Sequence, residues 1–251
     1  MTRFYRLGLV GYPLGHSLSP RLHTRALREA GLAGEYELYP IPLEDTHGLA
    51  SLLDRVRSGE IAGLNVTIPH KQAVLGMVDE LTPLADRAGA VNTLYARDGL
   101  LVGDNTDVPG FRADLERFLG AGHAQAGAAL VLGAGGAARA VVLALLDSGW
   151  QISLAARRIE QAQALAKCFP QPVKTLPLTT ESMEHLLPPP GLIVNATPLG
   201  MHPHTGTSPW PEGLPFPPGA AVYDLIYNPP QTRLVRDAFR TSVRPARPAF
   251  P

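Results

Sequence analysis

The sequence predicts an α/β protein with two domains, each built around a largely parallel sheet. Segments that resemble buried strands alternate with segments in which apolar residues have helical spacing. A glycine-rich turn, GAGGAA at 133–138, follows an apolar run and opens a helix-patterned segment, which is typical of a doubly wound dinucleotide-binding domain. With 251 residues, the chain is long enough for two domains of ordinary size.

In the first half, the apolar runs predict strands and the helical spacing predicts helices. For the first helix, Ser19 is the expected N-cap, Pro20 the first helical residue and Gly31 the stop. Asp98-Gly99 lies between two short apolar runs and predicts a hairpin. Strands are expected at 4–13, 35–43 and 61–69 and on both sides of that hairpin, and helices at 19–32, 49–60 and 71–90.

In the second half, a linking helix is expected at 109–120, followed by a second strand, glycine turn, helix and strand. Two later strands, within 191–201 and 220–230, each end in a polar loop. Of 25 prolines, 18 lie from Pro170 onward, so this part should contain long loops. The expected organisation is a first α/β domain at 1–108, a dinucleotide-binding domain at 109–240 and an irregular tail at 241–251.

The composition excludes several classes of protein. Lys plus Arg and Asp plus Glu each number 22, which gives no support for a nucleic-acid or anionic-membrane partner. Cys168 is the one cysteine, so neither an internal disulfide nor a cysteine-based zinc site is possible. The start resembles no signal peptide and no run of about 20 apolar residues follows, so a cytoplasmic protein is expected.

The glycine turn favours a bound dinucleotide. Gly133 allows a tight turn, Gly135 leaves room where the backbone approaches a pyrophosphate, and Ala138 lets helix and strand pack closely. The helix start offers unpaired N–H groups to phosphates. A purely structural glycine turn is the alternative. The residues expected to contact the cofactor here are Gly133, Ala134, Gly135, Gly136 and Ala137.

The end of the next strand favours NADP over NAD. NAD sites often have an acidic residue about 20 residues beyond the glycine turn, where it binds the ribose hydroxyls. This chain has Ala155 and Ala156 there, followed by Arg157 and Arg158. No carboxylate repels a 2′-phosphate and two guanidinium groups can bind it. The alternative is an exposed arginine pair at a helix start.

Seven motifs together resemble the shikimate dehydrogenase family. In order along the chain they are GHSLSP, NVTIPHK, GAVNT, DNTDVPGF, GAGGAAR, NATPLGM and YDLIYNP. The resemblance spans roughly residues 6 to 235. It implies reduction of 3-dehydroshikimate to shikimate with NADPH in aromatic amino-acid biosynthesis, by a substrate domain and a dinucleotide domain with the active site in the cleft between them.

The resemblance also implies a catalytic pair, Lys71 and Asp107. When a ketone is reduced, its oxygen gains negative charge and needs a proton donor. Lys71 would donate that proton and Asp107 would orient the ammonium group, while the cofactor carries the hydride chemistry. The alternatives are a solvated lysine at a helix start and, for Asp107, an N-cap before Pro109.

The remaining site residues follow from the same resemblance. A small carboxylate with several hydroxyls needs short polar contacts, and the family's substrate-binding positions correspond to Ser17, Ser19, Thr67, Asn92 and Tyr227. Thr197 and Leu225 lie where the family lines the nicotinamide pocket, although packing at strand ends is an equal alternative. His202 and His204 lack a third ligand in their loop, so no metal is expected.

Three alternatives remain open. A quinate/shikimate dehydrogenase that prefers NAD is disfavoured by Arg157 and Arg158, and a dehydrogenase acting on folates lacks support from the serine and Asn-Thr-Asp motifs. A catalytically impaired binding protein is suggested by the tail. There the family has a glutamine-bearing stretch and a final helix, which have no counterpart in this Arg- and Pro-rich segment. Weakened shikimate binding with ordinary NADP binding is therefore expected, in a monomer or homodimer.

Overall fold

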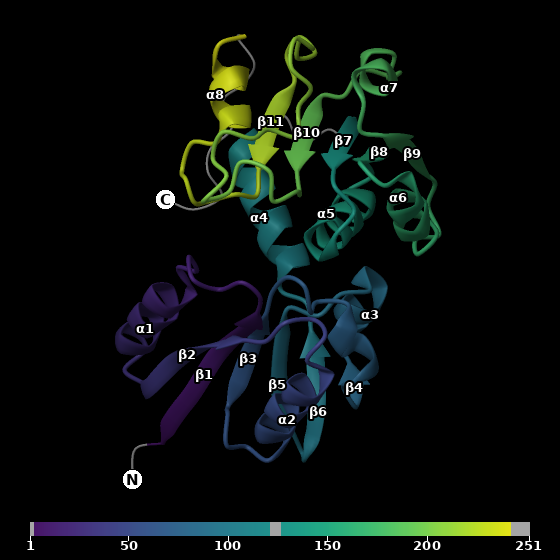
Figure 1. The fold of residues 1–251 in the computed structure, drawn as a ribbon. Helices are drawn as coiled ribbons and strands as arrows, with labels where there is room; N and C mark the ends of the chain where they lie inside the picture. Colours follow the sequence, from purple (N-terminus) through teal and green to yellow (C-terminus); the bar gives the residue numbers. More distant parts are fainter. Residues whose placement is uncertain (1–2, 121–126, 242–251) are drawn as a thin grey trace. The chain divides into compact units, whose positions relative to one another are not determined.

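The computed structural model describes residues 3–120 and 127–241. The chain divides into two compact units, the first ending at Thr106 and the second beginning at Asp107. Each unit has its own sheet with helices packed against it (Figure 1), which confirms the predicted α/β class. Of the expected tail at 241–251, only Thr241 is described, in a turn after the last helix, and the rest lies outside the described residues.

The first unit contains a six-stranded sheet in the order β2-β1-β3-β5-β6-β4. Its strands run parallel except for β5, which is antiparallel to both neighbours. The predicted hairpin joins β5 to β6, and both Asp98 and Gly99 have the positive φ that this turn requires. The strands are β1 (Phe4–Gly11), β2 (Ala33–Pro40), β3 (Gly63–Val66), β4 (Glu80–Leu81), β5 (Thr93–Arg97) and β6 (Leu100–Asp104).

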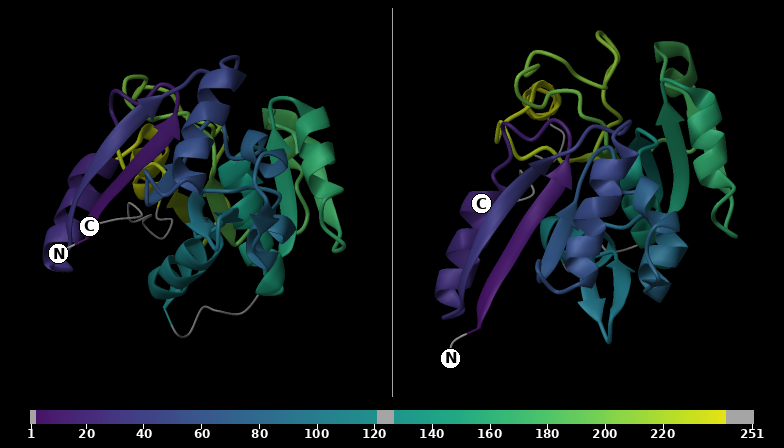
Figure 2. Two further views of the ribbon diagram at one scale, coloured as in Figure 1. Left: turned by 90° about the horizontal axis from the view of Figure 1, so that it is seen from below. Right: turned by 60° about the horizontal axis from the view of Figure 1, so that its bottom comes forward.

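Helices cover the two faces of this sheet unequally. Helix α2 (Thr46–Arg57) buries an apolar stripe in the main core of the unit, formed by Leu49, Leu52, Leu53 and Val56. On α1 (Ser19–Glu29) only Leu27 is buried, so its contribution to a core is small. Helix α1 lies along the edge strand β2 in both views of Figure 2. The better-covered face therefore supplies most of the apolar burial of this unit.

The ends of α1 show one wrong prediction and one confirmed prediction. Ser19 is the first helical residue and not the N-cap, because the preceding Leu18 already has helical φ and ψ. The N–H of Ser19 donates to Ser17 Oγ at 3.2 Å. The side-chain acceptor at the helix start, which was predicted to be Ser19, is therefore Ser17. The helix stops where predicted, because Gly31 has φ +67 and its N–H donates to Arg28 O at 3.1 Å.

The single helix expected at 71–90 is wrong. The segment forms a 3-10 turn η1 (Ala73–Gly76), the strand β4 and a short helix α3 (Pro83–Ala88). Asp79 interrupts the helical path, since its carboxylate accepts from the Leu101 N–H at 2.7 Å and aligns the chain with β6. Thr82 then accepts from the Ala85 N–H and caps a new helix, whose first residue is a proline.

The second unit contains a five-stranded parallel sheet in the order β11-β10-β7-β8-β9. This is the doubly wound arrangement that the glycine turn predicts, with the change of winding direction between β7 and β10. The strands are β7 (Ala128–Leu132), β8 (Gln151–Ala156), β9 (Val173–Pro177), β10 (Leu192–Asn195) and β11 (Ala221–Asp224). The helices are α4 (Asp107–Leu119), α5 (Gly136–Asp147), α6 (Ile159–Ala166), α7 (Thr180–Glu184) and α8 (Arg233–Phe239).

Two helices show how this sheet is covered. Helix α5 is apolar on nearly every side and is buried from Ala140 to Leu146, as expected for a central crossover helix. Helix α4 starts two residues before the predicted 109. It is joined to β11 through Tyr223, whose hydroxyl donates to Asp114 Oδ2 at 2.5 Å. Helix α5 therefore packs against the central strands β7 and β8, whereas α4 packs against α5 and contacts the edge strand β11.

Candidate active site

In the first unit, three predicted segments meet at the carboxyl edge of the sheet. The N–H of Thr67 donates to Val10 O at 2.9 Å, which continues the pairing of β3 with β1. Asn92 lies beside the end of β3, because the Val66 N–H donates to its carbonyl at 2.8 Å. The Asn92 N–H donates in turn to Asp104 O at 3.0 Å, at the end of β6. Segments far apart in the sequence therefore place Thr67 and Asn92 beside each other, directly after β3 and directly before the neighbouring strand β5.

The side chain of Asn92 is fixed by Thr106. Asn92 is 8% exposed, and its Oδ1 accepts from the Thr106 N–H at 2.9 Å. Its Nδ2 donates to Thr106 Oγ1 at 2.9 Å. Both bonds constrain the orientation of the amide, which matters for a group expected to recognise a hydroxyl. The resemblance predicted Asn92 but not the threonine that orients it, although the DNTD motif contains both Thr106 and Asp107.

Lys71 lies in the turn between β3 and η1, and hydrogen bonds hold the backbone of this turn. The Val91 N–H donates to Lys71 O at 2.8 Å. The preceding His70 is fully buried, and its Nε2–H donates to Ile41 O at 2.7 Å. Lys71 itself is half-buried and does not start a helix, and the half-buried Asp107 is the first residue of α4. The turn thus presents a lysine from a rigid base beside Thr67 and Asn92.

Ser17 and Ser19 lie at the start of α1, in the loop that follows β1. Gly11 lets the end of β1 lie close to Thr67, because a Cβ at position 11 would clash with the side chain of Thr67. Ser17 and Ser19 are both half-buried, and the Ser17 N–H donates to Leu14 O at 3.0 Å in the turn before them. Their hydroxyls can donate hydrogen bonds to a carboxylate.

A further polar contact at β3 was not predicted. Tyr36 on β2 donates its hydroxyl to Asn65 Oδ1 at 2.8 Å, and His23 of α1 stacks on the Tyr36 ring with centroids 4.4 Å apart. Asn65 precedes Thr67 by two residues, so both side chains project from the same face of the strand. Burial lowers the pKa of His23, which favours its neutral form in this stack. Strand pairing joins these residues, and no local motif indicates it.

The glycine turn of the second unit lies at the change in winding direction, between the ends of β7 and β10. Gly133 has φ +106, and its N–H donates to Ala155 O at 2.8 Å. A Cβ on Gly133 would come within 2.9 Å of Thr197 Cγ2. At Gly135, by contrast, a Cβ would meet no atom within 4 Å, so the space above the turn is open. Ala138 is fully buried, and Ala134, Gly136 and Ala137 are half-buried around this space.

These features fit a dinucleotide. The turn is tight at Gly133, where the fold requires it. The backbone is accessible at Gly135, where a pyrophosphate would bind at the start of the 12-residue helix α5. Arg157 and Arg158 follow β8 directly, and both are exposed. Neither guanidinium forms a hydrogen bond or ion pair with another residue that the structure describes, so both can bind a 2′-phosphate.

Thr197, Leu225 and Tyr227 lie in the two loops that follow β10 and β11. Thr197 contacts the glycine turn as described above, and Leu225 is half-buried, with its N–H donating to Asn195 O at 3.1 Å. Tyr227 is 40% exposed. Since the carboxyl ends of parallel strands are where doubly wound sheets bind ligands, the loops lie at the expected edge.

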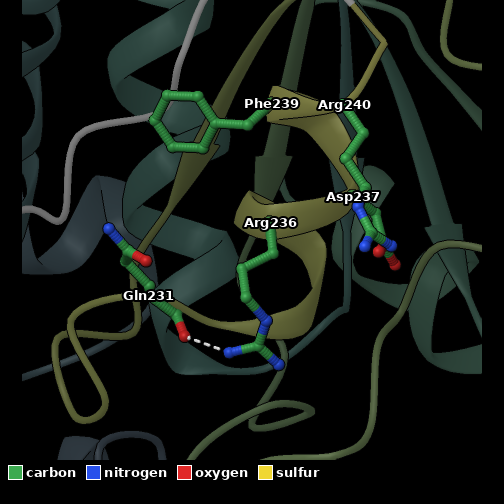
Figure 3. A pocket seen from close by; sticks show the side chains of 5 residues that line it. All are labelled: Gln231, Arg236, Asp237, Phe239 and Arg240. Atoms are coloured by element: carbon green, nitrogen blue, oxygen red, sulfur yellow. Dashed lines mark hydrogen bonds between the residues drawn. The ribbon is translucent and has the colours of Figure 1, made fainter.

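Other candidate sites contain none of the predicted site residues. A surface pocket of about 440 Å³ lies at α8, where Arg236 points toward Gln231 and donates to its main-chain oxygen at 2.8 Å (Figure 3). His202 and His204 are exposed in their loop. No group of three or more His, Cys, Asp or Glu side chains in the described part of the chain could hold a metal ion. No helix among the described residues is long and apolar enough to cross a membrane.

Comparison with known proteins identifies the family. Residues 9–94 match the shikimate dehydrogenase substrate binding domain. The NADP(+) shikimate dehydrogenase of Salinibacter ruber is 42% identical over 244 residues, covering 94% of this chain and 84% of that protein.

Solved structures show the same likeness. The shikimate dehydrogenase of Thermus thermophilus, in complex with NADP(H) and shikimate, superposes with a TM-score of 0.81 at 39% identity, covering 98% of this chain and 87% of that one. The quinate dehydrogenase of Corynebacterium glutamicum, in complex with NAD, has a TM-score of 0.83 at 31% identity, covering 96% of this chain and 87% of that one. Two sheets carrying the family's motifs at their carboxyl edges, together with 42% identity over most of both chains, show that this protein belongs to the shikimate dehydrogenase family.

Proposed function

We propose that this chain reduces 3-dehydroshikimate to shikimate with NADPH, in the biosynthesis of aromatic amino acids. The observation that supports this most is the convergence of NVTIPHK, GAVNT and DNTD at one edge of the first sheet, although they are separated in the sequence. The Salinibacter relative carries the same activity in its name.

The proposed roles follow from the chemistry of ketone reduction. Lys71 donates a proton from Nζ to the substrate oxygen as that oxygen gains negative charge. Asp107 orients the ammonium group and accepts a hydrogen bond from a hydroxyl of the substrate. Thr67 and Asn92 bind further hydroxyls, while Ser17 and Ser19 bind the carboxylate and Tyr227 completes the substrate contacts. NADPH supplies the hydride when it is bound.

The proposed cofactor site lies in the second unit. The turn from Gly133 to Ala137 binds the pyrophosphate, and Arg157 and Arg158 bind the 2′-phosphate, because both guanidinium groups are exposed and unengaged by other described residues. Thr197 and Leu225 border the nicotinamide. The open space above Gly135 is the structural feature that fits this group. The proposed organisation is a substrate domain at 1–108 and an NADP-binding domain at 109–240.

A spectrophotometric assay tests the function. Shikimate and NADP together should produce absorbance at 340 nm, and Lys71→Ala should lower kcat at least about 100-fold, since general acid catalysis typically contributes that much. Lys174→Ala is the control, because Lys174 is exposed near the amino end of β9, at the opposite edge of its sheet from the glycine turn. Near-normal kcat in Lys71→Ala would contradict the proposed role.

The same assay distinguishes the nearest alternative. A quinate dehydrogenase using NAD should show comparable or higher kcat/KM with quinate and NAD. We expect shikimate and NADP to be preferred. The expectation for NADP rests on the end of β8, which is followed directly by Arg157 and Arg158 and not by an acidic residue that would bind ribose hydroxyls. Light scattering should show a monomer or a homodimer. A chain that binds both ligands without turnover would instead be a binding protein of this fold.

A further inference from the structure

A buried carboxylate in the second unit has no place in the mechanism above. Asp224 ends β11 and is 0% exposed. Its Oδ1 accepts from Asn195 Nδ2 at 2.9 Å and from the Ile226 N–H at 3.0 Å, while its Oδ2 accepts from Thr232 Oγ1 at 2.6 Å. Burial raises the pKa of this carboxyl, and the three hydrogen bonds oppose that effect. A buried acid is costly unless its acceptors are used, and here both oxygens are.

The three donors come from three different segments. Asn195 ends β10, Ile226 lies in the loop after β11, and Thr232 caps α8 by accepting from the Val235 N–H at 3.3 Å. Parallel pairing sets Asn195 and Asp224 opposite one another, so their contact follows from strand register. The carboxylate is therefore a shared acceptor for the last strand, its loop and the helix that follows.

Asn195 transmits this constraint to the glycine turn. Its Oδ1 accepts from the Thr197 N–H at 2.9 Å and from Thr197 Oγ1 at 2.7 Å. With its hydroxyl bound in this way, Thr197 has its Cγ2 against Gly133, where an added Cβ would lie 2.9 Å away. The Asn195 amide thus accepts hydrogen bonds from the loop after β10 and donates one to Asp224 at the end of β11.

We propose that Asp224 is a positioning residue of the cofactor site, because its carboxylate ties the loop after β10 to the loop after β11 and, through Asn195, to the glycine turn. These loops carry Thr197, Leu225 and Tyr227, so Asp224 fixes the nicotinamide end of the site. The adenine end, at Arg157 and Arg158, lies after β8 and contacts none of this network. This inference rests on the proposed function, which places nicotinamide beside these loops.

Two variants separate positioning from simple stability. Asp224→Leu keeps the branching at Cγ, with methyl groups in place of the two oxygens, and so removes the acceptor that three buried donors share. Asp224→Asn keeps one oxygen for the Asn195 and Ile226 donors and turns its NH₂ toward Thr232, whose hydroxyl can also accept. Val222→Ala is the control, because Val222 is fully buried two residues earlier on β11 and carries no polar contact.

Three measurements on the full chain test the proposal. Calorimetry with 2′,5′-ADP reports the adenine end, NADPH fluorescence on binding reports the nicotinamide environment, and kcat for shikimate reports turnover. In Asp224→Leu we expect 2′,5′-ADP affinity within about twofold of wild type, a smaller NADPH fluorescence change and a kcat at least about tenfold lower, as one lost buried interaction can produce. Asp224→Asn and Val222→Ala should keep kcat within about threefold of wild type.

Each outcome either supports or overturns the proposal. An Asp224→Leu protein with normal NADPH fluorescence and kcat overturns it, and so does an equal loss of 2′,5′-ADP and NADPH binding. If Asp224→Leu does not fold, Asn195→Ala replaces it, since Asp224 then retains two donors and the same separation of effects is expected. If wild type does not oxidise shikimate, the proposed function fails, while 2′,5′-ADP and NADPH fluorescence still test the positioning.

Discussion

Removing one hydroxyl from β11 should weaken the packing of α4 by a measurable amount. Tyr223 is 2% exposed, and its hydroxyl donates to Asp114 Oδ2 at 2.5 Å. Its ring also packs edge-to-face against Phe111, with centroids 5.2 Å apart, and against Phe118 at 5.7 Å. Tyr223→Phe removes the hydrogen bond and keeps both ring contacts, so it isolates the polar contribution.

The size of the effect follows from these contacts. A hydrogen bond to a charged group contributes about 1.5–3 kcal/mol, but Asp114 is half-buried and water can replace part of the loss. We expect Tyr223→Phe to lower the free energy of unfolding by roughly 1–2 kcal/mol, which corresponds to a decrease in Tm of about 2–8 °C. Tyr223→Ala also removes the ring contacts and should cost roughly 3–5 kcal/mol.

The same bond predicts a pH dependence. Burial, and then the bond to Asp114, raise the pKa of Tyr223 above its ordinary value. A group whose pKa is raised on folding contributes stability that is complete below its unfolded pKa, about 10 for tyrosine, and is lost as the pH rises further. The stability difference between wild type and Tyr223→Phe should therefore be constant from about pH 7 to 10 and shrink above about pH 10.

Urea unfolding followed by tryptophan fluorescence is a suitable assay. Both tryptophans, Trp150 and Trp210, lie in the second unit and report its unfolding. Thr175→Val is the control, because Thr175 lies on β9 of the same unit and its half-buried hydroxyl forms no hydrogen bond with another described residue. A Tyr223→Phe protein as stable as wild type, or a stability difference that grows above about pH 10, would refute the reasoning.

Three further predictions concern the two proposed sites and one histidine. Arg157→Ala should weaken NADP binding by roughly 1–3 kcal/mol and leave NAD binding unchanged, as measured by calorimetry; equal weakening of both would mean that Arg157 supports the fold. Thr106→Val removes the hydroxyl that accepts from Asn92 Nδ2 and should raise KM for shikimate about 2- to 10-fold with KM for NADP unchanged, whereas an unchanged KM for shikimate would exclude Thr106 from orienting Asn92. Burial lowers the pKa of His23, so its contribution to stability is present above about pH 6.5 and is lost as the pH falls through the folded pKa. His23→Phe should therefore show a weaker decline in thermal stability below about pH 6.5, and an identical decline would count against this.

Local signals predicted much of the fold. Gly31 ends a helix at its expected position, and Asp98-Gly99 forms the expected hairpin. Both turns need positive φ, and the residue type decides how readily a position adopts it. The glycine turn was identified because strand, turn and helix are contiguous. The 71–90 helix was wrong, since Asp79 bonds to a strand 22 residues further along the chain, which no local spacing reveals.

In the candidate site, too, some residues could be predicted from the sequence and others could not. The resemblance predicted site residues that stand in motifs, such as Asn92 and Thr197. It did not identify the residues that orient them, because those contacts depend on strand register. The contact between Asn195 and Asp224 spans 29 residues and follows from the pairing of β10 with β11. Tyr36 and Asn65 are also 29 residues apart and meet because β2 and β3 both pair with β1.

Exposure of the two arginines after β8 has a consequence for how this protein can change. The guanidinium groups of Arg157 and Arg158 form no hydrogen bond or ion pair with other described residues, whereas Ala155 and Ala156 just before them are buried. Replacing either arginine therefore removes little that stabilises the folded chain. Selection on cofactor preference can act here almost independently of selection on folding, so descendants could exchange one nicotinamide cofactor for the other through a few substitutions without compensating changes in the core.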